Sequence, residues 1–202
     1  MITDNDKSIL RKVGEQYAEA AASPRNRENI RLWKCLNRGK MERPMVNIDQ
    51  FPYHELNEGG VLDCLVSDPF WRGYEQRIRR ELYKWNNCPG DMVLDPFFKI
   101  PMAINDSGYG LSRREELLLS DAKNDVVSHK YNAVLDNDAD IENIKDMVIT
   151  HDEAETSRRI GQAVDIFGDI APVRAGGYMF HLGLWDEITC LMGVENCYIR
   201  AR

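Results

Sequence analysis

Three short apolar runs, each followed by a segment with helical periodicity, constrain the fold of this chain most strongly. They lie at residues 44–49, 92–96 and 170–175. When a strand is followed by a helix and then by another strand, the helix returns the chain to the same end of the sheet, so the strands pair in parallel. The order of elements therefore predicts an α/β fold with a parallel sheet.

Three parallel strands are too few to close a barrel. An eight-stranded (β/α)8 barrel takes about 250 residues and at least ~200, whereas roughly the first 40 of these 202 residues have a helical pattern. We therefore expect an incomplete (β/α)8 TIM-type barrel, with a helical N-terminal extension at 1–40, the first part of the barrel at 41–202 and an antiparallel β-hairpin inserted at about 108–136. An unclosed sheet exposes an edge, which indicates a fragment of a longer polypeptide, half of a split protein or an oligomer.

Helical segments are the clearest local signal. Apolar residues recur at helical spacing, and Gly39 and Gly193 stand where two of the helices are expected to end. Thr150-His-Asp-Glu153 has the spacing of a capping box, which predicts a helix start at Thr150. The expected helices cover residues 6–22, 26–38, 69–86 and 179–192, with two more that begin at Asp140 and at Thr150.

Composition excludes several classes of function. A net charge of −7 and a pI near 5.2 argue against a general nucleic-acid binder. No stretch approaches the ~18 apolar residues of a membrane span, and the five cysteines form no CxxC pair, so we expect a cytoplasmic protein with reduced thiols. Asp136-x-Asp138-x-Asp140 lacks the glycine and glutamate that a calcium loop requires, because Ile141 and Met147 stand at those positions. No metal site is predicted.

Two carboxylates are the candidate catalytic residues. Asp49 and Asp95 each end an expected strand, where parallel α/β folds place their chemistry. If both face one cavity, mutual repulsion could raise the pKa of one and make it a general acid; the alternative is that each caps the following segment. His54, with its neighbour Tyr53, and His181 also follow strand ends and are candidates for lining the site, although a lone histidine is more often structural.

The third expected strand ends in a group of candidate substrate-binding residues. Arg174 could grip a carboxylate or phosphate through its planar guanidinium. Gly176 and Gly177 permit a tight turn, and the amino terminus of the helix beyond them would favour an anion. The alternative is a turn that needs glycine only for a positive φ.

At this point the linear pattern resembles a known family. "RENIRLWKCLNRGKMERPMVNID", "LDCLVSDPFWRGYEQRIRRELYKW" and "FGDIAPVRAGGYMFHLGLWDEITCLMGVENCYI" are similar to the amino-terminal half of the uroporphyrinogen decarboxylase superfamily. The resemblance runs from about Arg27 to the last residue and is carried by element order and by Trp33, Arg43-Pro44, Trp185-Asp186 and Gly193. It implies a (β/α)8 barrel with a substrate site at the carboxyl ends of the strands, where Asp49, Asp95 and Arg174 are expected.

One departure from the family selects a branch. Decarboxylases of the superfamily carry an arginine-rich loop after the first strand, but no arginine lies between Asp49 and Gly60. This favours the cobalamin-dependent methyltransferases, which demethylate small methylated compounds. In that branch a zinc site of histidine and cysteines lies in the second half of the fold, so zinc and a corrinoid are implied for the full-length protein and no cofactor for this chain alone.

The resemblance leaves three functions open. The first is the amino-terminal portion of a corrinoid-linked methyltransferase, inactive alone, whose partners are a small-molecule substrate, a corrinoid protein and the missing carboxyl-terminal half or a second copy. The second is uroporphyrinogen-type decarboxylation in tetrapyrrole metabolism. The third is a non-catalytic half-barrel whose exposed edge binds a partner chain.

Overall fold

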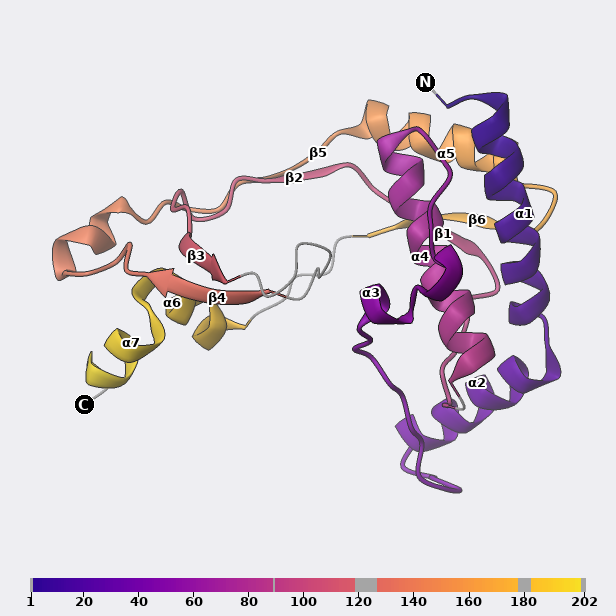
Figure 1. Ribbon diagram of the computed structural model, residues 1–202, viewed down its shortest axis with the longest axis horizontal. Helices are drawn as coiled ribbons and strands as arrows, with labels where there is room; N and C mark the ends of the chain where they lie inside the picture. Colours follow the sequence, from indigo (N-terminus) through magenta and orange to yellow (C-terminus); the bar gives the residue numbers. More distant parts are fainter. Residues whose placement is uncertain (1, 89, 119–126, 178–182, 201–202) are drawn as a thin grey trace. The chain divides into compact units, whose positions relative to one another are not determined.

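The computed structural model describes residues 2–88, 90–118, 127–177 and 183–200. The chain divides into two compact units: unit 1 is Met1–Pro101 with Thr156–Gly176, and unit 2 is Met102–Glu155 with Gly177–Arg202. Helices and strands both occur in the described residues, so the predicted mixed α/β class is confirmed at that level (Figure 1). The predicted boundary near residue 40 stays a prediction.

Unit 1 consists mainly of helices around one pair of strands. The expected helices at its amino end and at 69–86 are confirmed with bounds shifted by one or two residues. The elements of unit 1 are α1 (Asp4–Ala21), α2 (Pro24–Asn37), α3 (Tyr53–Leu56), η1 (Glu58–Gly60), α4 (Pro69–Asn87), β1 (Phe98–Pro101), α5 (Glu153–Phe167, of which residues from Thr156 belong here) and β6 (Val173–Gly176).

Side chains outside the helices fix where the helices begin. Thr3 and Asp6 form a capping box, in which each side chain accepts a hydrogen bond from the backbone N–H of the other. Ser23 caps α2 and Asp68 caps α4 by accepting hydrogen bonds from backbone N–H groups of the first turn, without a bond in return. α2 ends before Gly39, whose φ of 69° suits glycine. These local signals are the reason the sequence predicted the helices well.

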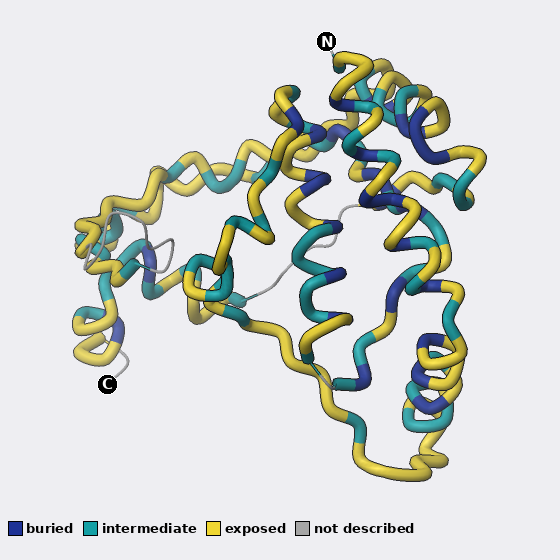
Figure 2. The backbone as a smooth tube through the Cα atoms, turned by 45° about the vertical axis from the view of Figure 1, so that its right-hand side comes forward, coloured by how far each residue is buried: buried dark blue, intermediate teal, exposed yellow. Residues whose placement is uncertain are grey.

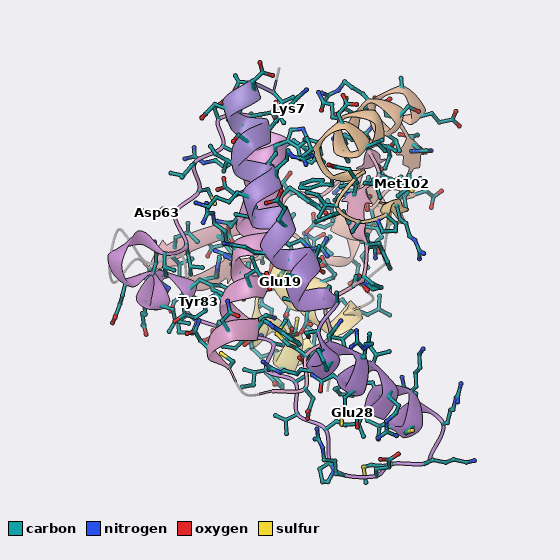
Figure 3. The ribbon with its side chains drawn as sticks, turned by 90° about the vertical axis from the view of Figure 1, so that its right-hand side faces the viewer. Lys7, Glu19, Glu28, Asp63, Tyr83 and Met102 are labelled. Carbon is teal, nitrogen blue, oxygen red and sulfur yellow. The ribbon has the colours of Figure 1, made fainter. Side chains whose placement is uncertain are left out.

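Aromatic rings fill the core of unit 1. Phe98 of β1 stacks on Phe167 of α5 with 4.2 Å between ring centroids, and Trp71 and Tyr74 of α4 contact Phe167 from another side. A Cβ added to Gly14 would lie 2.8 Å from the Phe167 ring, so α1 approaches closely only because that position is glycine. The buried stretches of the helices therefore face one another (Figure 2), with α1 in front in Figure 3.

The two strands of unit 1 pair in parallel, with Phe98 opposite Val173 and Pro101 opposite Gly176. Phe98 is 1% and Ile100 0% exposed, so one face of the pair lies against the helices. Lys99 and Arg174 lie opposite each other on the other face. The third expected strand, 170–175, is thus confirmed with a shift of the start to residue 173.

The other two expected strands are wrong. Residues 44–49 and 92–96 have neither strand nor helix, and β1 begins only at Phe98. In the second run, 92–96, backbone groups form hydrogen bonds with side chains of α2 instead of with a strand. The Asn26 side chain bonds both the N–H and the carbonyl of Leu94, and the Asn29 side chain donates to the carbonyl of Met92. Those side chains occupy the positions at which a neighbouring strand would bond.

Unit 2 contains the predicted hairpin. The elements of unit 2 are β2 (Ile104–Asp106), β3 (Arg114–Leu118), β4 (Ser128–Asn132), η2 (Asp138–Asn143), β5 (Ile149–His151), α6 (Leu184–Met192) and α7 (Val194–Arg200). β3 pairs antiparallel with β4, and β2 with β5. The antiparallel pair inside 108–136 is therefore confirmed, while the expected turn at 122–125 lies outside the described residues.

Two helix starts differ from the prediction. Thr150 lies in β5, and α5 starts at Glu153, because the Asp152 carboxylate accepts a hydrogen bond from the N–H of Glu155 at 2.8 Å. The expected helix from Asp140 is only the short 3-10 segment η2. Gly193, with a φ of 77°, ends α6 as predicted.

Candidate functional site

Asp95, one of the predicted catalytic residues, lies ahead of β1 rather than at the carboxyl end of a strand. This corrects the sequence prediction, because the strand starts three residues later. The Asp95 N–H donates a hydrogen bond of 3.1 Å to the hydroxyl oxygen of Tyr17 in α1. Asp95 therefore belongs to the amino end of the strand pair, next to the end of α1.

A hollow of about 240 Å³ opens beside Asp95 and Tyr17. The N–H of Phe98 donates to the carbonyl of Pro172 at 2.8 Å, which ties together the two segments that lead into β1 and β6. Ala18 and Ala21 of α1 and Ala22, which follows the helix, leave the space open, since none of these side chains extends beyond Cβ. The lining is formed by Tyr17, Ala18, Ala21, Ala22, Asp95, Pro96, Phe97, Phe98, Ile170, Ala171 and Pro172.

The charge beside this hollow is negative. Burial raises the pKa of Tyr17 well above its usual range, and the carboxylates of Glu81 and Asp95 raise it further. The guanidinium of Arg77 opposes that effect, but it is hydrogen-bonded to Glu81 at 2.9 Å. Asp95 makes no ion pair with any of the residues that the structure describes, so its charge is left uncompensated.

Arg174 lies in the middle of β6, not at its carboxyl end. Its guanidinium carbon lies 4.3 Å from the centre of the Phe97 ring. Arg174 lies on the same face of the strand pair as Lys99. Gly176 and Gly177 have no positive φ, so the alternative, a turn that needs glycine for a positive φ, is wrong; the residues that follow, 178–182, lie outside the described ranges. Gly176 instead serves close packing, because an added Cβ would lie 2.8 Å from the Lys99 side chain.

The remaining predicted site residues gather around the carboxyl-terminal half of α4. Asp49 is exposed in the irregular stretch before α3. Tyr53 lies under the guanidinium of Arg80 at 4.3 Å, and burial raises its pKa. His54 lies 3.5 Å from the carboxylate of Glu55. Asp95 lines the hollow described above, whereas Asp49 is not among the residues that line it, so the two do not share that cavity.

Comparison with known proteins does not assign this chain to a family. No protein-family model matches it, and neither the curated proteins nor the solved structures contain a match.

The described residues do not offer the ligands that zinc requires. Structural and catalytic zinc sites take three or four His, Cys, Asp or Glu ligands, and no group of three or more such residues is found in the ranges that the structure covers. No step of chemistry is therefore assigned to a metal here. In the same residues, no helix is long and apolar enough to cross a membrane.

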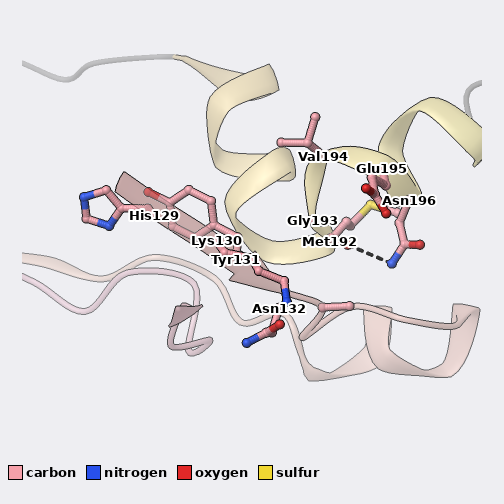
Figure 4. A pocket seen from close by; sticks show the side chains of 10 residues that line it. His129, Lys130, Tyr131, Asn132, Met192, Gly193, Val194, Glu195 and Asn196 are labelled. Atoms are coloured by element: carbon pink, nitrogen blue, oxygen red, sulfur yellow. Dashed lines mark hydrogen bonds between the residues drawn. The ribbon is translucent and has the colours of Figure 1, made fainter. Parts of the chain in front are cut away.

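Unit 2 contains a second hollow, of about 440 Å³ (Figure 4). It lies between β4 and the corner of α6 and α7, and its walls include His129, Tyr131 and Glu195. The rings of His129 and Tyr131 are parallel within 8°, and His129 Nδ1 lies 2.9 Å from the Glu115 carboxylate. The two rings lie on one face of β4, and the His129–Glu115 pair crosses the hairpin to β3, which is the usual role of such a pair in a sheet.

Sequence reasoning missed Tyr17 as a site residue and predicted it only as an apolar member of a helix. Tyr17 and Asp95 are 78 residues apart in the chain. The spacing of apolar residues shows which face of a helix is buried, but not which distant backbone group the hydroxyl of a buried tyrosine will bond. His181 lies outside the described residues.

Proposed function

We propose that this chain is the amino-terminal portion of a uroporphyrinogen decarboxylase-type barrel protein whose parent activity is corrinoid-linked methyl transfer to or from a small methylated compound. The observation that supports it best is the parallel pair β1 and β6, which are connected through α5 and covered by helices on one face only. A segment of a (β/α)8 barrel has this arrangement, with helices outside and a free face inside. Unit 1 would then be an incomplete barrel.

The free face of the strand pair is the part that binds substrate in this proposal. Lys99 and Arg174 stand opposite each other there and make the face positive. The Phe97 ring under the guanidinium holds it in a fixed plane, and a planar guanidinium binds a carboxylate or phosphate through two parallel hydrogen bonds. Arg174 thus orients an anionic substrate, and Lys99 adds charge beside it.

Residues 44–49 are held beside the segment that leads to β1, although they form no strand. The carbonyl of Val46 accepts a hydrogen bond of 2.7 Å from the N–H of Asp91, and the N–H of Val46 donates to the Asp91 carboxylate at 2.8 Å. Arg43 binds the same carboxylate at 2.6 Å and lowers its pKa to about 2.

A methyl-transfer assay tests the proposal. The protein encoded by the whole reading frame that contains these residues should move a methyl group from a small methylated acid to cob(I)alamin, which forms methylcobalamin and the demethylated acid, or catalyse the reverse reaction. Purified residues 1–202 should do neither. Arg174→Ala should raise KM about tenfold with little change in kcat, because the guanidinium contributes binding rather than chemistry. Arg38→Ala, an exposed arginine after α2, is the matched control and should leave both constants unchanged.

Two outcomes would replace the proposal. Turnover by residues 1–202 alone would show that no other half is needed. Release of carbon dioxide from a porphyrinogen, without methyl transfer, would assign the chain to the decarboxylases.

A specific observation also favours the third function, a partner-binding half-barrel. Val46 and Ile48 are 55% and 44% exposed although they belong to the expected strand. Exposed apolar side chains on a segment without regular structure offer a surface that another chain can cover. Sedimentation of the purified chain tests this: a stable complex that Ile48→Lys dissolves would support the partner-binding function, and a monomer at all concentrations would oppose it.

A further inference from the structure

We infer that an exposed apolar surface on α6 and α7 of unit 2 binds a basic amphipathic helix of another protein (Figure 1). The inference is independent of the proposed reaction, because the proposed substrate lies on β1 and β6 of unit 1. The surface, called the α6–α7 surface below, is formed by Leu184, Trp185, Ile188, Val194 and Tyr198.

The first of these helices turns its large apolar side chains to solvent. The residue of α6 that is buried is the small Cys190, whereas Leu184, Trp185 and Ile188 are 61%, 49% and 43% exposed. Successive residues of a helix turn by about 100°, so these three lie within one arc of about 100° and Cys190 lies roughly opposite. An apolar stripe of that width normally packs against another element.

The second helix extends the same surface. Val194 and Tyr198 stand four residues apart on α7, which places them on one side of it, and they are 50% and 65% exposed. Trp185 meets Tyr198 edge to face with 5.9 Å between ring centroids, so the apolar sides of the two helices adjoin.

The area of the α6–α7 surface suits a transient complex. Five large side chains that are each about half exposed present roughly 500 Å², which is near the upper end of the ~300–600 Å² of the largest apolar patch on a typical monomer. A stable complex buries about 800 Å² on each partner. We therefore expect a partner of the size of one helix and a dissociation constant in the micromolar range.

Charge selects the kind of helix. Unit 2 has 16 Asp and Glu residues and 7 Lys and Arg residues, a formal charge of −9, whereas unit 1 has 17 and 19, a formal charge of +2. The negative charge of the chain therefore originates in the unit that exposes the α6–α7 surface. Such a unit attracts a basic partner and repels both nucleic acid and a second copy of itself.

Charges on the two helices favour the same partner. Asp186 and Glu195 are exposed on α6 and α7, where lysine or arginine side chains beside an apolar stripe would meet them. Arg113 and Arg200 donate hydrogen bonds to acceptors within unit 2, so these two cations are already engaged. A helix with apolar residues at positions i, i+3, i+4 and i+7 and basic residues elsewhere matches the surface in both respects.

The probe is a synthetic peptide of about 18 residues, long enough to form a helix, with leucine at those apolar positions and lysine elsewhere. Isothermal titration calorimetry with the full chain should show micromolar binding that weakens as salt is added. One control peptide has glutamate in place of lysine, and another has the same composition in an order that forms no apolar face. Binding of either control as tight as that of the probe would overturn the inference.

Trp185→Ala tests the location. It should weaken the probe about tenfold, because a tryptophan that becomes buried in an interface contributes strongly to binding. Leu65→Ala removes an apolar side chain of unit 1 that is 64% exposed and should leave binding unchanged. Equal affinities of the two variants for the probe would place it elsewhere and refute the site.

A second variant keeps the inference testable if Trp185→Ala alters the fold of unit 2. Leu184 is more exposed than Trp185, so Leu184→Lys leaves the packing in place, and its charge repels the lysines of the probe. It should also weaken binding about tenfold at low salt. Undiminished affinity in this variant would contradict the assignment.

Paired charge variants separate a local effect from net charge. Asp186→Asn combined with Glu195→Gln should weaken the probe more than Asp138→Asn combined with Glu142→Gln, which removes two exposed carboxylates elsewhere in unit 2. Equal weakening would mean that the probe responds only to the total charge, and the proposed surface would be rejected.

Light scattering of the chain without peptide tests the remaining occupant, a second copy. A monomer is expected because two units with a charge of −9 repel each other. A dimer that Trp185→Ala dissociates would show that a second copy covers the α6–α7 surface, and the inference of a basic helix would be wrong.

Discussion

Unit 1 and unit 2 differ in how they bury apolar side chains. Unit 1 encloses the rings of Trp71, Phe98 and Phe167 with almost no exposure, whereas the buried apolar residues of unit 2, among those the structure describes, are Ala103, Cys190 and Cys197. Unit 2 instead exposes large apolar side chains: Leu117, Leu118, Ile141, Ile144, Val148, Ile149, Leu184, Trp185, Ile188, Val194, Tyr198 and Ile199. Only unit 1 therefore has a core of the kind that stabilises an independent domain.

Unit 2 is connected by contacts that contribute little to stability. Arg113 binds the carboxylate of Glu187 through one nitrogen at 2.7 Å, but both side chains are exposed, and such pairs contribute about 0–1 kcal/mol. The carbonyl of Leu191 accepts hydrogen bonds from the N–H groups of Val134 and Leu135. Two-stranded antiparallel pairs are marginally stable alone. The comparison teaches that secondary structure forms in both units, whereas cooperative stability belongs to unit 1.

The largest expected effect comes from Phe167→Ala. Phe167 is fully buried and contacts Phe98, Trp71 and Tyr74, so its removal leaves a cavity in the only aromatic core that the described residues form. We expect a loss of about 3–5 kcal/mol in the free energy of unfolding, measured by urea denaturation followed by circular dichroism. Val164→Ala, an exposed change on the same helix, should cost less than about 0.5 kcal/mol. Similar losses for both would mean that α5 does not pack as described.

The same difference explains how much could be predicted from the sequence. The helices of unit 1 were predictable because the apolar spacing that marks them, and caps such as Thr3 and Asp68, are local in sequence. The runs at 44–49 and 92–96 have the composition of strands, but whether such a run pairs depends on distant partners. Asn26 forms a hydrogen bond with Leu94, which is 68 residues away in the chain. No pattern within residues 92–96 indicates this partner.

The candidate site residues also depended on contacts between distant parts of the chain. Asp95 was expected at the end of a strand but precedes one, because strand pairing begins only at Phe98. Arg174 was expected at the end of a strand and lies inside one because β6 continues to Gly176. Tyr17 reaches Asp95 through tertiary packing of α1 alone. The sequence shows which residue types are present, but it does not show which of them contact one another in the fold.

An intermediate effect is expected at Asp6, which joins α1 to the segment before α4. Its carboxylate accepts hydrogen bonds from the N–H and the hydroxyl of Ser67 and from the N–H of Thr3, and these bonds lower its pKa from 3.8 to about 2. A pKa lowered by folding means that the ionised form stabilises the native state. The contribution is present in full above about pH 4 and is lost as the pH falls toward 2.

The variant Asp6→Asn keeps the shape of this side chain but replaces one acceptor oxygen with a donor. We expect a loss of about 1–3 kcal/mol at neutral pH and a shallower fall in stability between pH 4 and pH 2. Urea denaturation across that range measures both. Asp4→Asn, an exposed carboxylate in the same turn of α1, should change neither. An acid-induced loss as steep in Asp6→Asn as in the native chain would assign the effect to other carboxylates.

The smallest expected effect is at Trp185, and it tests unit 2 most directly. Trp185 is 49% exposed and meets Tyr198 edge to face with 5.9 Å between ring centroids. If nothing covers these rings in solution, Trp185→Ala should shift the free energy of unfolding by less than about 0.5 kcal/mol, and amides of β3 and β4 should exchange hydrogen with similar rates in both proteins. A loss comparable to that of Phe167→Ala would mean that another surface covers the rings, since an uncovered indole has little burial to lose. Sedimentation at several concentrations would then show whether that surface belongs to a second copy. In that case the exposed apolar side chains of unit 2 would be one side of an interface. Unit 1 would then bury its apolar side chains within the chain, and unit 2 would bury them against another molecule.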